Sequence, residues 1–221
     1  MFGIEIDIKR RMEALEKEFN ELKGLYDNYK IPYEMPWVMK NDFFSAEFRN
    51  KIIKEQGYVF LSHNWLSELA IWIGKRKCLE VMSGGGALAY NLRKHGVNII
   101  STDNYRFKEM KEEGNLSWDF KMWENVEKLD CIEAIEKYGK KVDIVIMAWA
   151  YMDLNAYRTL MKMREVNPNC LMIFIGEGYG GCTANDDFFE EINIIDDEEF
   201  NKINEHFESW NFINDRLVLL K

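Results

Sequence analysis

The sequence predicts a doubly wound α/β fold, in which helices cover both faces of a mostly parallel sheet. From residue 62 onward, strand-like and helix-like segments alternate along the chain, as they do in βαβ units. Two strand segments, residues 142–150 and 170–176, are almost entirely apolar, which indicates burial on both faces, as in a parallel sheet. The tail, residues 207–221, reads as two strands meeting near Asn214 and Asp215, which predicts an antiparallel hairpin at the sheet edge.

The individual elements follow from hydrophobic periodicity and from the residues at their ends. A helix should begin at Ser62, a good N-cap residue, and end at Gly74. The expected strands are residues 77–82, 97–102, 124–129, 142–150 and 170–176. The expected helices between them are residues 62–74, 87–96, 131–139 and 153–166.

A long helix is expected at the N-terminus, over residues 4–30, before the two prolines of "KIPYEMP" end it. Its apolar residues alternate in steps of four and three, as in a heptad seam: Ile8, Met12, Leu15, Phe19, Leu22, Tyr26 and Tyr29. The seam fits two alternatives, a helix packed on its own domain or a contact that forms a homodimer. The chain is therefore divided into an N-terminal helical appendage, residues 1–57, and a main domain, residues 58–221.

Composition describes a globular protein rather than a membrane protein. Of 221 residues, 47% are hydrophobic and 30% are charged, and no run of about 18 apolar residues occurs. The N-terminus has no signal-peptide core, so we expect a cytoplasmic protein without a membrane partner. The net charge of −9 disfavours tight binding to bare nucleic-acid phosphates. The four cysteines form no CxxC pair and only three histidines are present, so no metal site is expected.

The most informative short segment is a glycine triplet between an expected strand and an expected helix. Gly84 could adopt the positive φ of a tight turn, and Gly86 would leave no side chain between backbone and ligand. Ala89 supplies a third small residue where strand and helix pack closely. Asp103, at the end of the next strand, could accept both hydroxyls of a ribose. This spacing favours a loop that binds a nucleoside or dinucleotide.

The segment "LEVMSGGGALAYNLRKHGVNIISTD" resembles motif I and the following acid of class I S-adenosylmethionine-dependent methyltransferases, which have a Rossmann-like fold. Glu80 matches the acid of their E-x-x-x-G-x-G pattern, where dinucleotide dehydrogenases usually have an apolar residue. The segments "IGEGYGGCT" and "SWNFINDRLVLL" are similar to a narrower, little-characterised methyltransferase-like group. The resemblance covers about residues 58–221 and implies S-adenosylmethionine as the cofactor, with no assigned acceptor.

The resemblance also implies positions for the cofactor. Its methionine half would lie beside Glu80, Gly84 and Gly86. Asp103 would bind the ribose, and Asn104 would lie next to the adenine.

Asp130, Cys131 and Trp149 complete the expected cofactor site. Trp149 is also the first residue of a segment that differs from the family pattern. Asp130 and Cys131 would contact the adenine, and Asp130 could at the same time cap the helix that follows. Relatives tend to carry W-P-P-Y after the fourth strand, where this chain reads Trp149, Ala150, Tyr151 and Met152. Trp149 is kept as a cofactor-binding residue, but the loss of both prolines weakens the case for methylation of an amine.

The acceptor should face the loops after the fourth and fifth strands, because ligands bind beyond the carboxyl ends of such strands. Glu177 and Tyr151 are the expected catalytic residues, with Glu177 as a base if the acceptor must lose a proton. Glu177 could instead bind the backbone amides of its own glycine-rich loop. Large aromatic residues elsewhere, such as Trp65, Trp72 and Trp118, are expected in the core.

The sequence therefore predicts an S-adenosylmethionine-binding methyltransferase with an unknown small-molecule or macromolecular acceptor. One alternative is a catalytically inactive cofactor-binding or assembly module with the same fold, which the altered turn after the fourth strand favours. The second alternative is an NAD-dependent oxidoreductase, against which Glu80 argues.

Overall fold

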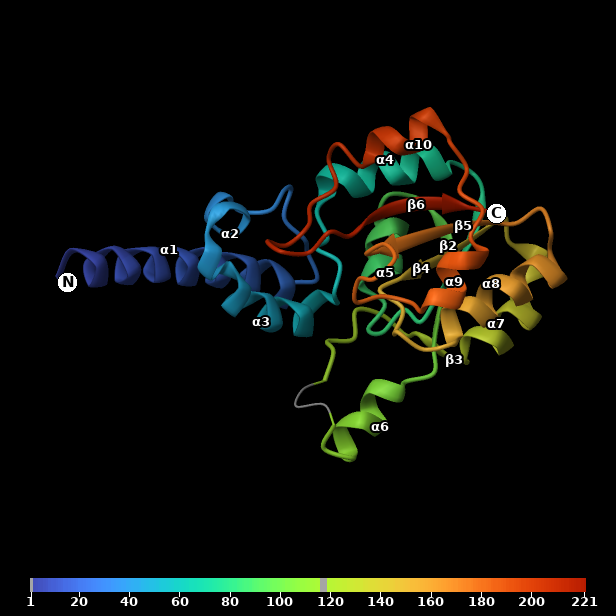
Figure 1. The fold of residues 1–221 in the computed structure, drawn as a ribbon, viewed down its shortest axis with the longest axis horizontal. Helices are drawn as coiled ribbons and strands as arrows, with labels where there is room; N and C mark the ends of the chain where they lie inside the picture. The colour runs from blue at the N-terminus through green and yellow to red at the C-terminus, as the bar shows by residue number, and fades with distance from the viewer. Residues whose placement is uncertain (1, 116–118) are drawn as a thin grey trace.

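The computed structural model describes residues 2–115 and 119–221, and the side chains of residues 7–115 and 119–221. Its centre is a six-stranded sheet with the strand order β3-β2-β1-β4-β5-β6 (Figure 1). Neighbouring strands are parallel except β5 and β6, which are antiparallel. The strands are β1 (Lys77–Val81), β2 (Asn98–Asp103), β3 (Glu127–Lys128), β4 (Ile144–Ala148), β5 (Leu171–Gly176) and β6 (Arg216–Leu220). This topology confirms the predicted fold class, a doubly wound, mostly parallel sheet with an antiparallel edge.

The central strands are apolar because each of their faces meets a layer of helices. Along β4, Ile144 and Ile146 belong to the core on one face, whereas Val145 and Met147 belong to the core on the other. The helices α4 (His63–Ile73), α5 (Ala87–Lys94) and α10 (Glu198–Ile203) cover the first face. The helices α7 (Cys131–Tyr138), α8 (Asn155–Val166) and α9 (Asp186–Glu191) cover the second. None of the helices in the described ranges is both long enough and apolar enough to cross a membrane.

The N-terminal helices form one continuous core with the sheet. They are α1 (Phe2–Asp27), α2 (Trp37–Asn41) and α3 (Ala46–Gln56), with a 3₁₀ turn, η1 (Phe43–Ser45), between the last two. Figure 1 shows the first turns of α1 extending beyond the rest of the molecule. Farther along α1, Leu15, Leu22 and Tyr26 are fully buried in the same cluster as Trp65 of α4. The middle of the seam thus packs within its own chain, whereas Ile8 near its start is 39% exposed.

Hydrogen bonds also join this N-terminal part to distant segments. The backbone N–H of Met35 donates to Glu208 Oε1 at 2.8 Å, and Asn211 Nδ2 donates to the Asp42 carbonyl at 2.9 Å. Much of the segment 11–57 is thus packed into the main domain. A homodimer contact through the N-terminal helix stays a prediction.

The C-terminal edge differs in detail from the predicted hairpin. Only its second half is a strand, β6, and its antiparallel partner is β5. Residues 207–214 form coil and turn, because Trp210 is buried in the core and Phe212 adopts a φ of 68°, which a regular strand does not allow. On its other side, β6 meets the chain through a bridge between Leu220 and Ile194.

Several smaller expectations have clear outcomes. Ser62 does hold the N-cap position of α4, although its side chain makes no capping hydrogen bond. The predicted strand at residues 124–129 is reduced to the two residues of β3. An additional helix, α6 (Arg106–Glu112), follows β2 and projects from the body in Figure 1. Trp65 is buried and Trp72 packs partly buried against the core, as expected, whereas Trp118 lies outside the described residues.

Candidate functional site

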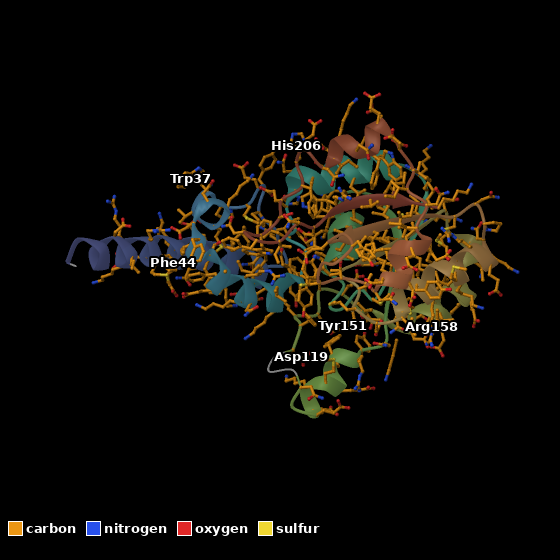
Figure 2. The ribbon with its side chains drawn as sticks, in the orientation of Figure 1. Trp37, Phe44, Asp119, Tyr151, Arg158 and His206 are labelled. Atoms are coloured by element: carbon orange, nitrogen blue, oxygen red, sulfur yellow. The ribbon has the colours of Figure 1, made fainter. Side chains whose placement is uncertain are left out.

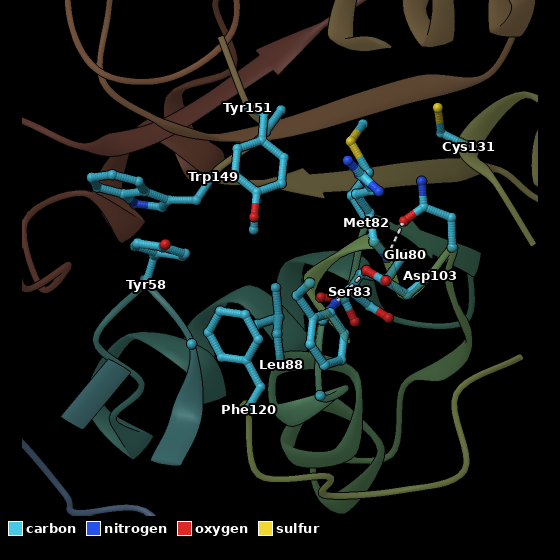
Figure 3. A pocket seen from close by; sticks show the side chains of 18 of the residues that line it. Tyr58, Glu80, Met82, Ser83, Leu88, Asp103, Phe120, Cys131, Trp149 and Tyr151 are labelled. Carbon is cyan, nitrogen blue, oxygen red and sulfur yellow. Dashed lines mark hydrogen bonds between the residues drawn. The ribbon is translucent and has the colours of Figure 1, made fainter. Parts of the chain in front are cut away.

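A cavity of ≈ 360 Å³ opens at the carboxyl ends of β1, β2 and β4 (Figure 3). The chain leaves β1 toward β2 on one side and reaches β4 on the other, so this is the crossover point where open α/β sheets bind ligands. Volumes of about 300–1,000 Å³ are usual for small-molecule sites. Its lining includes eight of the ten predicted site residues: Glu80, Gly84, Asp103, Asn104, Asp130, Cys131, Trp149 and Tyr151.

The glycine loop forms a tight turn at the end of β1. The N–H of Ser83 donates to the Thr102 carbonyl of β2 at 3.1 Å, and the N–H of Gly86 donates back to the Ser83 carbonyl at 2.9 Å. Gly84 has a φ of 56°, lines the cavity, and a Cβ built on it would meet no atom within 4 Å. This position lets a ligand approach the backbone.

Gly86 has a different role from the one expected. It is absent from the cavity lining, and a Cβ at this residue would lie 2.7 Å from Val126 Cγ2 and 2.8 Å from Glu124 Cγ. Its φ of 76° and this close approach explain the glycine by packing against the segment before β3. Contact between Gly86 and a cofactor stays a prediction.

Asp103 connects β2 to the glycine loop. Its Oδ2 accepts a hydrogen bond from the Gly84 N–H at 2.7 Å, and its Oδ1 accepts one from the Tyr105 N–H at 2.6 Å. Burial raises the pKa of this carboxyl group, while the two N–H groups act in the opposite direction. The residue thus presents a carboxylate to the cavity from a fixed position.

Glu80 is the most deeply buried acid at the site. It lies in β1 with 2% of its surface exposed, and its Oε2 accepts a hydrogen bond from the Ala89 N–H of α5 at 3.1 Å. Burial raises the pKa of Glu80 to about 8, so the side chain is largely protonated at neutral pH. A cation placed beside it would favour the charged form.

The loops after β2 and β3 line the same half of the cavity as Glu80 and Asp103, at its far end. Asn104 is exposed, and its Oδ1 accepts from the Arg106 N–H at 2.9 Å. Asp130 caps α7, with its Oδ1 accepting from the N–H groups of Ile132 and Glu133 at 2.8 and 2.9 Å. The predicted capping role is confirmed. Burial raises the pKa of the Cys131 thiol, which keeps it protonated and unreactive.

Five of the described aromatic residues line the cavity, and Phe107 of α6 packs against Phe120 with ring centroids 5.1 Å apart. We call the other four the aromatic wall: Tyr58, Phe120, Trp149 and Tyr151. Figure 3 shows them on the side of the cavity away from Asp103 and Cys131. The rings of Tyr58 and Trp149 are stacked, with centroids 5.3 Å apart and an interplanar angle of 12°. Neither Tyr58 nor Phe120 is marked by hydrophobic periodicity, because each lies in an irregular segment.

Trp149 is held in place from behind the wall. Its backbone has a φ of 52° and its N–H donates to the Ile175 carbonyl of β5 at 2.8 Å. The indole Nε1–H donates to Asp215 Oδ2 at 2.8 Å, and the Arg49 guanidinium lies 5.2 Å from the ring centroid. Asp215 and Arg49 were not predicted as site residues, although Asp215 belongs to the "SWNFINDRLVLL" segment.

Glu177 lies near this cluster but does not line the cavity. Its Oε2 accepts from the Cys182 N–H at 2.8 Å and its Oε1 from the Asn214 N–H at 3.1 Å. Burial acts to raise the pKa of Glu177, but these N–H groups, together with the Cys182 side chain and the Arg49 charge, hold the pKa below its usual value. The carboxylate thus binds backbone amides, as the alternative to a catalytic role predicted. The donors are Cys182 and Asn214 rather than the glycines of the loop. Its role as a base stays a prediction.

Comparisons with known proteins give only a likeness of fold. No protein-family model matches the sequence, and no curated protein matches it. Among solved structures, the magnesium protoporphyrin IX methyltransferase of Synechocystis PCC 6803, with bound S-adenosylmethionine, is 11% identical with a TM-score of 0.44. That match covers 82% of this chain and 92% of the other.

Two further solved structures are similar at the same level. The mitomycin 7-O-methyltransferase MmcR is 11% identical with a TM-score of 0.43, over 92% of this chain and 67% of that chain. A mutant of MtNAS in complex with S-adenosylmethionine is 13% identical with a TM-score of 0.41, over 99% and 74%. With TM-scores below 0.5, these proteins assign neither ligand nor activity to this chain.

Proposed function

We propose that this protein binds S-adenosylmethionine in the cavity and transfers its methyl group to an acceptor. The observation that carries the proposal is the position of four residues at the β1–β2–β4 crossover. One continuous cavity is lined there by Glu80 of β1, Gly84 of the loop after β1, Asp103 at the end of β2 and Asp130 after β3.

The chemistry of this half of the cavity fits the cofactor. The Asp103 carboxylate would accept hydrogen bonds from the ribose hydroxyls, and Gly84 would leave room for the methionine portion. Glu80, with a pKa of about 8, would gain charge next to the methionine ammonium. Asp130 and Asn104 would lie at the adenine. When bound, S-adenosylmethionine supplies an electrophilic methyl group.

The acceptor would bind on the side of the aromatic wall, where Tyr151 and Trp149 follow β4. Tyr151 is 46% exposed, and Figure 2 shows it between the sheet and α6. Methyl transfer is a direct displacement, so positioning of the two reactants can supply much of the catalysis. In this proposal Tyr151 orients the acceptor, and Glu177 shapes the neighbouring loop through its bonds to Cys182 and Asn214.

A cofactor-binding module without turnover is the second candidate function. It is favoured by the turn after β4, where Ala150 and Tyr151 replace two prolines of the family pattern. The Ala150 carbonyl also accepts a hydrogen bond from the Ala184 N–H at 3.0 Å, so it is already used within the protein. Cofactor binding without labelled product across a broad acceptor screen would favour this candidate.

A thermal-shift panel with S-adenosylmethionine, S-adenosylhomocysteine, NAD and ATP tests the proposed ligand. A ligand at 100 times its dissociation constant adds about 2.7 kcal/mol to the free energy of unfolding. We expect both adenosyl compounds to stabilise the protein, and NAD and ATP to have no effect. Stabilisation by NAD alone would point to the oxidoreductase alternative.

Two matched glycine variants locate the binding. Gly84→Val should abolish the shift, because the added side chain enters the cavity. Gly96→Val is the control, since Gly96 also has a positive φ and open space around it but does not line the cavity. An unchanged shift in Gly84→Val would remove the glycine loop from the site.

A further inference from the structure

The geometry points to a planar aromatic ring that carries an ionisable hydroxyl group as the methyl acceptor. This inference rests on the proposed function and names the substrate class of the same site. It is carried by the aromatic wall and by the hydrogen bonds that its neighbours already make.

The aromatic wall offers ring surfaces to an acceptor, together with the hydroxyl groups of Tyr58 and Tyr151. Its four members come from three segments: Tyr58 before α4, Phe120 before β3, and Trp149 and Tyr151 after β4. Tyr58 and Phe120 meet edge to face, with centroids 6.0 Å apart. Pairs of aromatic rings stabilise each other beyond the burial of area, provided that the bound group is itself a ring.

The wall is preorganised, which matters because ordering it on binding would cost affinity. Tyr58 stacks on Trp149, and Asp215, which is 5% exposed, accepts the indole N–H. The Arg49 guanidinium lies over the same indole. A rigid stacking surface selects for a flat group and gives little advantage to a flexible aliphatic chain.

The oxygen atoms on this side that could orient an amine each already accept one hydrogen bond within the protein. An amine acceptor needs an oxygen atom to accept its N–H, and the Ala150 carbonyl after β4 already accepts from Ala184. Asp153 lines the same side, but it is exposed and both of its oxygens accept bonds from Asn155 at 2.9 Å. The rest of the wall consists of ring surfaces.

Groups that could remove a proton are equally scarce on this side. Among the described lining residues there is no histidine, and Glu177 is bound to backbone amides outside the lining. Burial raises the pKa of Tyr58 and of Tyr151, so their hydroxyls keep their protons at neutral pH. An acceptor that ionises readily demands least of these groups, and a ring hydroxyl ionises far more readily than an aliphatic alcohol because the ring delocalises the charge.

The transfer balances without any further reactant. The ring oxygen forms a bond to the methyl carbon as the sulfur–carbon bond breaks, the sulfur keeps that electron pair, and the hydroxyl proton passes to water. The wall's part in this step is to hold the ring so that its oxygen faces the methyl group.

Binding of matched ring and saturated probes to the protein loaded with S-adenosylhomocysteine tests the inference. The probes are phenol against cyclohexanol, and 1-naphthol against decahydro-1-naphthol, followed by calorimetry and ligand-observed NMR. We expect each aromatic probe to bind about tenfold more tightly than its saturated partner. Equal binding within a pair, or no binding of any probe, would overturn the inference.

Two wall variants and one control complete the test. Tyr58→Leu and Phe120→Leu should each reduce the preference for the ring several-fold while leaving the affinity for S-adenosylhomocysteine within about twofold. Tyr33→Leu, at a residue that is 70% exposed and outside the cavity lining, should change neither. Retained affinity for S-adenosylhomocysteine shows that each variant is folded. If the wild type does not bind S-adenosylhomocysteine, the proposed function fails, and the inference with it.

Discussion

Glu80 and Glu177 show how burial and backbone hydrogen bonds give two carboxyl groups opposite properties. Glu80 is surrounded by core residues and has one backbone donor, so its pKa rises to about 8. Burial also acts to raise the pKa of Glu177, but two backbone donors, the Cys182 side chain and the nearby Arg49 charge together lower it. Each difference leads to a test of one residue.

Glu80→Gln should change how stability depends on pH. In the folded protein Glu80 keeps its proton until about pH 8, whereas the unfolded chain releases it near 4.5. The contribution of Glu80 to the free energy of unfolding is therefore full below pH 4.5 and is lost as the pH rises to about 8. Gln has no proton to lose and can keep the bond from Ala89, so the variant should gain roughly 3–5 kcal/mol relative to wild type across this window.

Urea unfolding of both proteins at pH 5 and pH 8.5 measures that difference directly. If the difference in the free energy of unfolding between the two proteins is the same at both pH values, Glu80 is charged in the folded state. The same variant should bind S-adenosylhomocysteine less tightly, because an amide cannot balance the ammonium.

Glu177→Gln separates a role in the loop from a role in the cofactor site. The amide can accept from only one of the two N–H groups, so Cys182 or Asn214 would face an NH₂ group. We expect a loss of about 1–3 kcal/mol in the free energy of unfolding, and affinity for S-adenosylhomocysteine within about twofold of wild type. A large loss of that affinity at unchanged stability would instead place Glu177 at the cofactor.

Among the elements, α1 is the one whose role the sequence left open. Its heptad spacing predicted a packed stripe, and the structure buries Leu15, Leu22 and Tyr26 of that stripe against the chain's own core. Periodicity identifies which face of a helix is buried but not the surface that covers it, because that surface comes from segments far away in sequence.

Truncations at two points of α1 test this packing. Removal of residues 1–30 takes away three buried side chains worth about 1.5–3 kcal/mol each, which is comparable to the whole stability of a domain. We expect it to abolish cooperative unfolding. Removal of residues 1–9 shortens the part of α1 that extends beyond the rest of the molecule in Figure 1 and keeps the ion pair between Arg11 and Asp42, so thermal unfolding should change little. A folded 31–221 fragment would show that α1 is dispensable to the core.

The strands could be predicted because their signal is local. Residues 144–148 and 171–176 are apolar at every position except a glycine, and the structure makes them β4 and β5. The tail was predicted less well. Tryptophan is common in strands, but the side chain of Trp210 is buried in the core and the segment around it is not a strand. The short helix α6 carries no strong periodic pattern, and the sequence did not reveal it.

Across the whole molecule, the lining of the cavity draws on segments from the end of α3 to the first turns of α8. The Lys121 N–H donates to the Lys54 carbonyl at the end of α3, and the Trp123 N–H donates to the Gly85 carbonyl of the glycine loop, both at 2.8 Å. Tyr58 and Gln56 bring the end of the N-terminal segment into the lining. The predicted cofactor residues were found because they lie in one short motif, whereas the aromatic wall depends on these long-range contacts.

The measurement that tests the central claim most directly is calorimetric titration of S-adenosylhomocysteine into wild type and Asp103→Ala. The account predicts one site per chain in the wild type. It also predicts a loss of about 1.5–3 kcal/mol of binding free energy in the variant, because the ribose hydroxyls lose a charged acceptor. Asp103→Asn, which keeps the shape of the side chain, should lose affinity as well. No binding by the wild type, or affinity within twofold in both variants, would contradict the account.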